Sequence, residues 1–165
     1  MKQSIIEERI LLIRGLRVML DTDLAELYGT STRAINQAVK RNSNRFPSDF
    51  MFQLSAVEKE EVVTNCDHLA GLKYSRNLPY AFTEHGAIMA ANVLNSARAV
   101  EMSVFIVRAF VKIREALSTS RALAGKLAEL EQKVGKHDEA IHTILMTIHE
   151  LMGNRKSALR RKIDF

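Results

Sequence analysis

The sequence predicts an α+β protein: a small helix-turn-helix-like domain with short strands, followed by a long C-terminal coiled-coil helix. In the first part of the chain, short apolar stretches with strand character alternate with helix-capping residues. Two short helices there are separated by a glycine, as in helix-turn-helix units. In the last part, apolar residues recur at alternating steps of four and three, which is the period of a coiled coil.

A β-hairpin is expected over residues 10–20, because apolar residues flank a turn at Gly15. Asp21 and Thr22 are suited to cap the helix that follows. Gly29 would end that helix, since glycine readily adopts the left-handed conformation found at helix ends. The hairpin and the helix together form the start of the domain.

A second helix is expected over about residues 32–42, capped by Thr30 and Ser31. Its apolar residues share one face, which would pack inward. They are Ala34, Ile35, Ala38 and Val39. The opposite face carries Arg33, Asn36, Gln37, Lys40 and Arg41.

The remainder of the domain mixes one strand, one extended piece and three helices. Residues 49–54 are rich in aromatics and predict a strand, and Ser55 with Glu58 forms a capping box for a helix to about residue 64. The polar residues 65–76 predict a loop, and residues 79–82 an extended piece. Thr83 would cap a helix to about residue 94. An amphipathic helix follows over residues 97–117.

The polar face of the second helix has the chemistry of a DNA-reading surface. Arginine and lysine bond guanine or phosphate, and asparagine and glutamine can bridge the two major-groove positions of adenine. The base contacts would come mainly from Asn36 and Gln37 with one or two cations. No acidic residue occurs from residue 27 to 48. Arg14, Arg17 and Arg45 are expected near phosphates, and the alternative is a basic face that is merely solvated.

The heptad repeat predicts a parallel two-stranded coiled coil. Leu127, Val134, Ile141 and Ile148 occupy a positions, and Leu123, Leu130, Ile144 and Leu151 occupy d positions. His137 is the one polar interruption, and the alternatives for it are a residue that sets the register, a frayed point of the coil, or a pH sensor. Lys126 would face Glu131 of a partner, and Lys133 would face Asp138. A trimer, a helical hairpin and a helix that folds back on its own domain remain open alternatives.

Composition favours an anionic partner and a reducing compartment. The net charge is +5 and the isoelectric point is near 9.5. Cys66 is the single cysteine, so an internal disulfide is excluded. Neither an export signal nor an apolar run long enough to span a membrane is visible. We expect a cytoplasmic protein with no membrane association.

No catalytic or metal site is expected. Cys66, His68 and His85 are candidate metal ligands, but zinc motifs show paired ligands at defined spacings, which this sequence lacks. A glycine-rich phosphate loop and a nucleophile elbow are also missing. We therefore expect a protein without enzymatic activity and without a cofactor.

Six motifs follow one another in chain order: Ile13 to Gly15, Val18 to Gly29, Val39 to Asn42, Arg45 to Leu54, Leu78 to Gly86, and Val107 to Phe110. Together they resemble the KilA-N DNA-binding domain family, in the branch named for the N-terminal domain of a phage open reading frame. The resemblance covers roughly residues 5–115. It implies a compact α+β DNA-binding domain of phages, prophages and other mobile elements, often found in antirepressor or regulatory proteins.

These features predict a DNA-binding regulator of phage, prophage or mobile-element type that binds double-stranded DNA as a coiled-coil homodimer. We divide the chain into a KilA-N-like DNA-binding domain (residues 5–117), a parallel coiled-coil dimerisation helix (118–152) and a basic C-terminal tail (153–165). The alternative is an antirepressor-type interaction module that binds a repressor protein and does not bind DNA.

Overall fold

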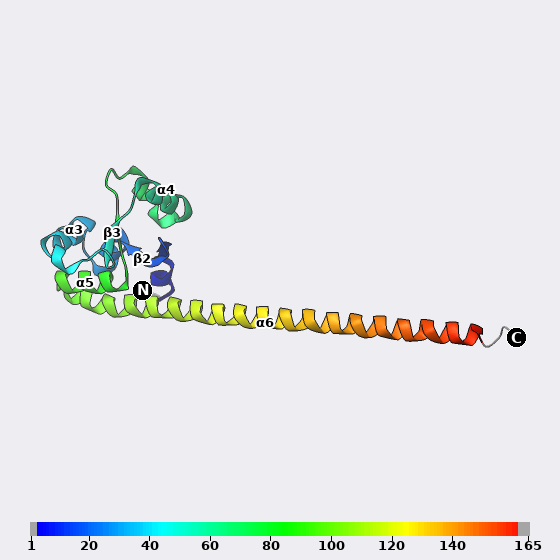
Figure 1. The fold of residues 1–165 in the computed structure, drawn as a ribbon. Coiled ribbons are helices and arrows are strands. Elements are labelled where there is room, and N and C mark those ends of the chain that lie inside the picture. Colours follow the sequence, from blue (N-terminus) through cyan, green and yellow to red (C-terminus); the bar gives the residue numbers. More distant parts are fainter. Residues whose placement is uncertain (1–2, 162–165) are drawn as a thin grey trace. The chain divides into compact units, whose positions relative to one another are not determined.

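The computed structural model describes the backbone of residues 3–161 and the side chains of residues 3–152. It divides into two compact units, residues 1–115 and 116–165. The first is an α+β domain around a four-stranded antiparallel sheet (Figure 1). Helix α6 (Ala97–Arg161) begins in this unit and forms the second one. The predicted α+β class with a long C-terminal helix is confirmed, and the predicted basic tail lies outside the described side chains.

The domain contains short strands and helices that follow the predicted order closely. Its helices are α1 (Gln3–Glu8), α2 (Asp21–Tyr28), α3 (Thr32–Arg41), η1 (Ser43–Arg45), α4 (Ala56–Asn65), η2 (Asp67–Tyr74) and α5 (Glu84–Leu94). Its strands are β1 (Leu11–Ile13), β2 (Leu16–Leu20), β3 (Met51–Gln53) and β4 (Tyr80–Phe82), in the sheet order β1-β2-β4-β3.

The predicted hairpin is confirmed, and its turn consists of Arg14 and Gly15. Their φ angles are +54° and +74°. Two-residue turns with both φ angles positive match the right-handed twist of the strands that they join. The turn sets the pairing of β1 with β2, in which Leu12 lies opposite Arg17.

The sheet separates two hydrophobic clusters, because alternate strand residues point to opposite faces. Met19 and Phe82 face a large cluster shared with helices α2, α3, α5 and α6. Their neighbours Val18 and Ala81 face a smaller cluster that includes residues of α4 and η2. Figure 1 shows α4 apart from α3 and α5, with β2 and β3 between them. We call α4 and η2 together the α4–η2 lobe.

The start of α2 differs from the prediction. The N-cap position is Leu20 and makes no side-chain hydrogen bond, while Asp21 is the first helical residue and is almost completely buried. Strand β2 ends at Leu20 and α2 begins at the next residue, so no linker supplies a separate capping residue. Capping by Asp21 and Thr22 was therefore the wrong interpretation, and Asp21 has a different role, described below.

The predicted loop over residues 65–76 is also wrong in part, because most of it forms the 3-10 helix η2. Leu69 is buried and Leu72 packs beside it in the smaller cluster. These two apolar residues fold the segment against α4. The expected caps of α4 and α5 are confirmed: Ser55 and Glu58 form the capping box, and Thr83 caps α5 by accepting a hydrogen bond from the Gly86 amide. Of the two residues expected to cap α3, Ser31 is the N-cap.

The end of α2 is fixed by Gly29, as predicted. Its φ angle is +68°, and a Cβ atom added there would lie 2.6 Å from Arg98 Cδ. Arg98 donates a hydrogen bond from Nε to the Leu27 carbonyl at 3.1 Å. The left-handed backbone therefore favours glycine at this position, and a larger residue would also displace the Arg98 side chain. This contact joins α2 to the start of α6.

The second unit is a continuation of α6 with an exposed apolar seam. Its a and d residues from Leu123 to Leu151 are between 46% and 67% exposed in this single chain. The helix is unbroken to Arg161, which rules out a hairpin within the described residues. None of the described helices combines the length and hydropathy needed to cross a membrane.

Candidate nucleic-acid interface

Helix α3 presents a polar, cationic face to solvent. The Ser31 hydroxyl accepts a hydrogen bond from the Ala34 amide, and Ile35 and Val39 are buried against the domain. Inward packing at these two positions turns the opposite side of the helix outward. The exposed side chains on that side are Arg33, Gln37, Lys40 and Arg41. They agree with the predicted outward face, with Asn36 as the exception.

Asn36 is half-buried and its amide is already engaged. Its Nδ2 donates to Asp21 Oδ2 at 2.8 Å, which joins α3 to the first residue of α2. Its Oδ1 is buried and has no hydrogen-bond partner among the described residues. The geometry therefore shows Asn36 fixing α3 to the domain.

The predicted phosphate contacts lie in different surroundings. Arg45 is exposed at the end of η1, directly after α3. Arg14 makes two hydrogen bonds to Glu58, at 2.7 and 2.9 Å, and its guanidinium lies 4.4 Å from the centre of the Phe52 ring. Arg17 is half-buried on β2, and its Nε has no partner among the described residues. Only Arg45 is thus both exposed and close in sequence to α3.

Six cations of the domain are bonded within the fold. Arg9, Arg14, Lys59, Arg98, Lys112 and Arg114 each bond a carboxylate or a carbonyl of the fold. By contrast, no hydrogen bond or ion pair within residues 3–152 engages the exposed cations of α3 and η1. These are Arg33, Lys40, Arg41 and Arg45. The unpaired positive charge on these two elements is available to an anionic ligand.

A cleft of about 1270 Å³ lies beside α3. One side is formed by α3, including Arg33, Gln37 and Lys40, and the other by η2 and the segment from Ser75 to Tyr80. Asp21, Thr22 and Asp23, at the start of α2, also line the cleft. The cleft therefore combines cations on α3 with carboxylates from the domain interior.

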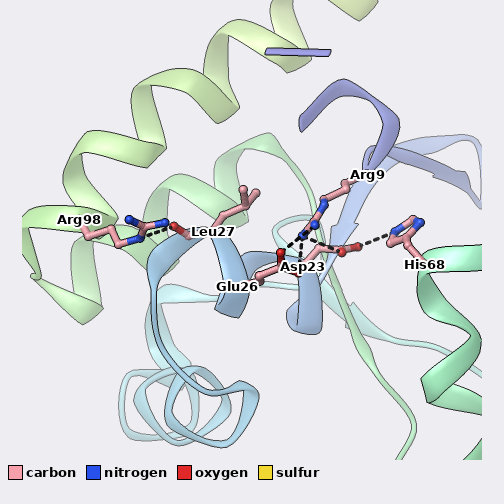
Figure 2. A network of polar contacts seen from close by, with 6 residues as sticks. All are labelled: Arg9, Asp23, Glu26, Leu27, His68 and Arg98. Carbon is pink, nitrogen blue, oxygen red and sulfur yellow. Dashed lines mark hydrogen bonds and ion pairs between the residues drawn. The ribbon is translucent and has the colours of Figure 1, made fainter. Parts of the chain in front are cut away.

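A polar network holds this side of the domain together (Figure 2). Arg9 makes two hydrogen bonds to Glu26, at 2.8 and 2.9 Å, and lies 3.3 Å from Asp23. His68 Nε2, from η2, lies 3.4 Å from Asp23 Oδ2. Burial has the largest effect and raises the pKa of Asp23, while the His68 ring and the Arg9 guanidinium oppose that rise. The network links η2 and the residue after α1 to helix α2.

The three candidate metal ligands have separate environments. His68 faces Asp23, while His85 stacks on Phe50 with ring centres 5.5 Å apart. Cys66 is half-buried, and burial raises the pKa of its thiol. Among the side chains that the structure describes, no three His, Cys, Asp or Glu groups gather as metal ligands would.

A comparison with protein families identifies the domain. The ORF6N domain matches residues 8–93, which is just over half of the chain. The chain belongs to the ORF6N domain family. ORF6N is a KilA-N-related phage domain and a non-catalytic family, so the predicted resemblance is confirmed. Neither the curated proteins nor the solved structures gave a match to this chain.

The ORF6N match ends just before Leu94, the last residue of α5. It therefore includes α3, the sheet and the α4–η2 lobe. Sequence reasoning missed the part of this domain that faces α3 across the cleft, namely Arg76 and Asn77. A usable signal was present, because residues 68–83 contain no acidic residue but include Lys73 and Arg76. The same pattern, cations without neighbouring acidic residues, indicated the polar face of the second helix.

The hydrogen bond between the buried Asp21 and the half-buried Asn36 predicts a pH-dependent stability of the ORF6N domain. Burial is the largest influence and raises the pKa of Asp21, against hydrogen bonds from Asn36 and the backbone. A carboxyl whose pKa is raised by folding favours the fold at low pH, and this contribution is lost as pH rises from its ordinary value of 3.8 through the folded value. Urea unfolding of Asp21→Asn should therefore show less loss of stability with rising pH than the unsubstituted protein shows.

Two comparisons make this test specific. In Asp21→Asn, the oxygen of the new amide can still accept a hydrogen bond from Asn36 Nδ2. The nitrogen of the new amide can donate to Asn36 Oδ1, which has no partner among the described residues of the unsubstituted protein, so we expect no loss of stability at neutral pH. Asp21→Ala removes the acceptor and should cost about 1–3 kcal/mol. Parallel pH profiles of Asp21→Asn and the unsubstituted protein would contradict the assignment.

Proposed function

We propose that this ORF6N protein is a regulator of phage, prophage or mobile-element type that binds duplex DNA through α3 as a coiled-coil dimer. The observation that carries the proposal is the contrast among the cations. Six cations elsewhere in the domain bond carboxylates or carbonyls of the fold, whereas Arg33, Lys40, Arg41 and Arg45 on α3 and η1 are exposed and make no such bond within residues 3–152. Cationic side chains without internal partners are free to neutralise phosphates.

The geometry of α3 modifies the assignment of contacts. An α-helix fits the major groove of B-DNA, and base edges there are read by long polar side chains. We assign base reading to Gln37 together with Arg33 and Lys40, because all three are exposed on one side of α3. Asn36 supports the helix through Asp21 in this proposal. Arg41 and Arg45 would bind phosphates, while Arg14, already paired with Glu58, contributes less.

We assign the dimer interface to the exposed apolar seam of α6. Nine large apolar side chains lie exposed along a single helix between Leu123 and Ile148, which is unusual for a monomer. The heptad positions and the two lysine–acid pairs favour a parallel partner of the same sequence. A dimer would place two α3 helices on two half-sites and would raise the apparent affinity through effective concentration.

Salt-dependent DNA retention tests the proposal. Genomic fragments retained by the unsubstituted protein should carry a motif of two half-sites. The Lys40→Gln/Arg41→Gln variant should bind about 10- to 100-fold more weakly at moderate salt, because two phosphate or base contacts are lost. Its plot of log affinity against log salt should become shallower by about two.

The matched control removes two exposed cations outside α3, Arg108 and Arg121, by the same substitutions. It has the same net charge as the α3 variant and should retain nearly full affinity. If the unsubstituted protein retains no DNA even at low salt, the alternative of a module that binds a repressor protein takes the place of this proposal. Equal losses in both variants would show that binding is not localised on α3.

A further inference from the structure

Helix η2 and the segment that follows it, residues 75–80, form the side of the cleft opposite α3, and this part of the chain carries two exposed cations. Ser75, Arg76, Asn77 and Leu78 line the cleft across from Arg33 and Lys40. Lys73 and Arg76 are exposed and make no hydrogen bond or ion pair within residues 3–152. Three exposed cations without a partner among the described residues, Arg33, Lys40 and Arg76, thus line one cleft.

The fold holds this segment in position. Lys59 of α4 donates hydrogen bonds from Nζ to the carbonyls of Ser75 and Asn77. Gln53, at the end of β3, donates to the Leu78 carbonyl at 3.1 Å. At the other end of η2, His68 contacts Asp23. The segment is therefore anchored on two sides, and a ligand would meet it in a preset position, with little ordering cost on binding.

Buried polar groups line the cleft together with the cations. Asp21 is 2% exposed, and its Oδ1 is one of three buried polar atoms here without a hydrogen-bond partner among the described residues. The other two are Thr22 Oγ1 and Asn36 Oδ1, and all three residues line the cleft. These three atoms are buried, so the exposed cations Arg33, Lys40 and Arg76 are the groups in the cleft that an anionic sugar–phosphate strand would contact.

We propose that this cleft holds the sugar–phosphate strand bordering the groove that α3 enters, and that Arg76, in the segment after η2, is a second phosphate contact. The inference rests on the proposed DNA binding by α3. It adds a contact from a different element, 36 residues after Lys40 in the chain. Helix α3 and the segment after η2 would contact one strand from its two sides, and these contacts would fix the orientation of α3 in the groove.

The test compares Arg76→Gln with Lys40→Gln and with Arg108→Gln on the selected DNA site. Arg76→Gln should weaken binding by about 3- to 10-fold for every sequence and should reduce the salt slope by about one. The selected motif should stay the same, since phosphate contacts carry no sequence information directly. Arg108→Gln should leave affinity and slope unchanged. Arg76 is exposed and unpaired, so the unfolding midpoint of its variant should match that of the unsubstituted protein.

A phosphate scan then locates the contact. Each phosphate of the site is replaced in turn by a neutral methylphosphonate. The unsubstituted protein should lose affinity when one or two particular phosphates are replaced, and Arg76→Gln should lose no affinity at those positions. This inference would be overturned if Arg76→Gln had the salt slope and the phosphate scan of the unsubstituted protein. If Lys40→Gln still weakened binding in the same experiment, DNA binding by α3 would stand. Absence of DNA binding by the unsubstituted protein would overturn both proposals.

Discussion

Replacing Gly86 with alanine is expected to unfold the ORF6N domain, or to lower its free energy of unfolding by about 3 kcal/mol or more. A Cβ atom at this position would lie 2.0 Å from Phe50 O and 2.9 Å from the carbonyl carbon of Phe50. That carbonyl cannot move away cheaply, because it accepts hydrogen bonds from both the amide and the hydroxyl of Thr83. The glycine lets α5 approach the backbone before β3.

Urea unfolding followed by tyrosine fluorescence measures this effect in the domain alone, because the chain has no tryptophan and its three tyrosines all precede residue 81. Gly71→Ala is the matched control. A Cβ atom at Gly71 meets nothing within 4 Å, so that variant should change stability by less than about 0.5 kcal/mol. An unfolding midpoint for Gly86→Ala equal to that of the unsubstituted protein would show that the α5 contact is looser than the structure indicates.

Ile141→Glu is expected to convert the dimer to a monomer and to lower DNA affinity by about 100-fold or more, through loss of the second binding unit. Ile141 occupies an a position, so each copy would bring a carboxylate into the apolar seam, where two like charges face each other. Sedimentation or light scattering reports the oligomeric state, and titration of a two-half-site DNA reports the affinity.

Met146→Glu is a closely matched control for this variant. Met146 lies at an f position on the outer side of the proposed coil, and the two side chains have nearly equal exposure, 55% for Met146 and 54% for Ile141. The same charge introduced there should leave both the dimer and the affinity intact. If both variants remain dimeric, the proposed seam is not the interface. If Ile141→Glu is monomeric with full affinity, dimerisation is not needed for binding.

The hairpin, the caps of α3, α4 and α5, and the long helix could be predicted because their signals are local. A turn at Gly15, a capping box from Ser55 to Glu58, and inward packing at Ile35 and Val39 each depend on residues no more than four positions apart. The errors occurred where tertiary contacts prevail. The segment after α4 looked polar, but Leu69 and Leu72 have a cluster to join only once the sheet is formed.

The sequence by itself determined the α+β class, the family motifs, the cationic face of α3 and the heptad seam of α6. Only the tertiary structure decided which polar groups on these elements are free. Asn36 is engaged by Asp21, Arg14 is neutralised by Glu58 44 residues away, and Arg76 lies across the cleft from α3. Periodicity reports which side of a helix faces outward, whereas the pairing of charges depends on segments that meet only after the chain has folded.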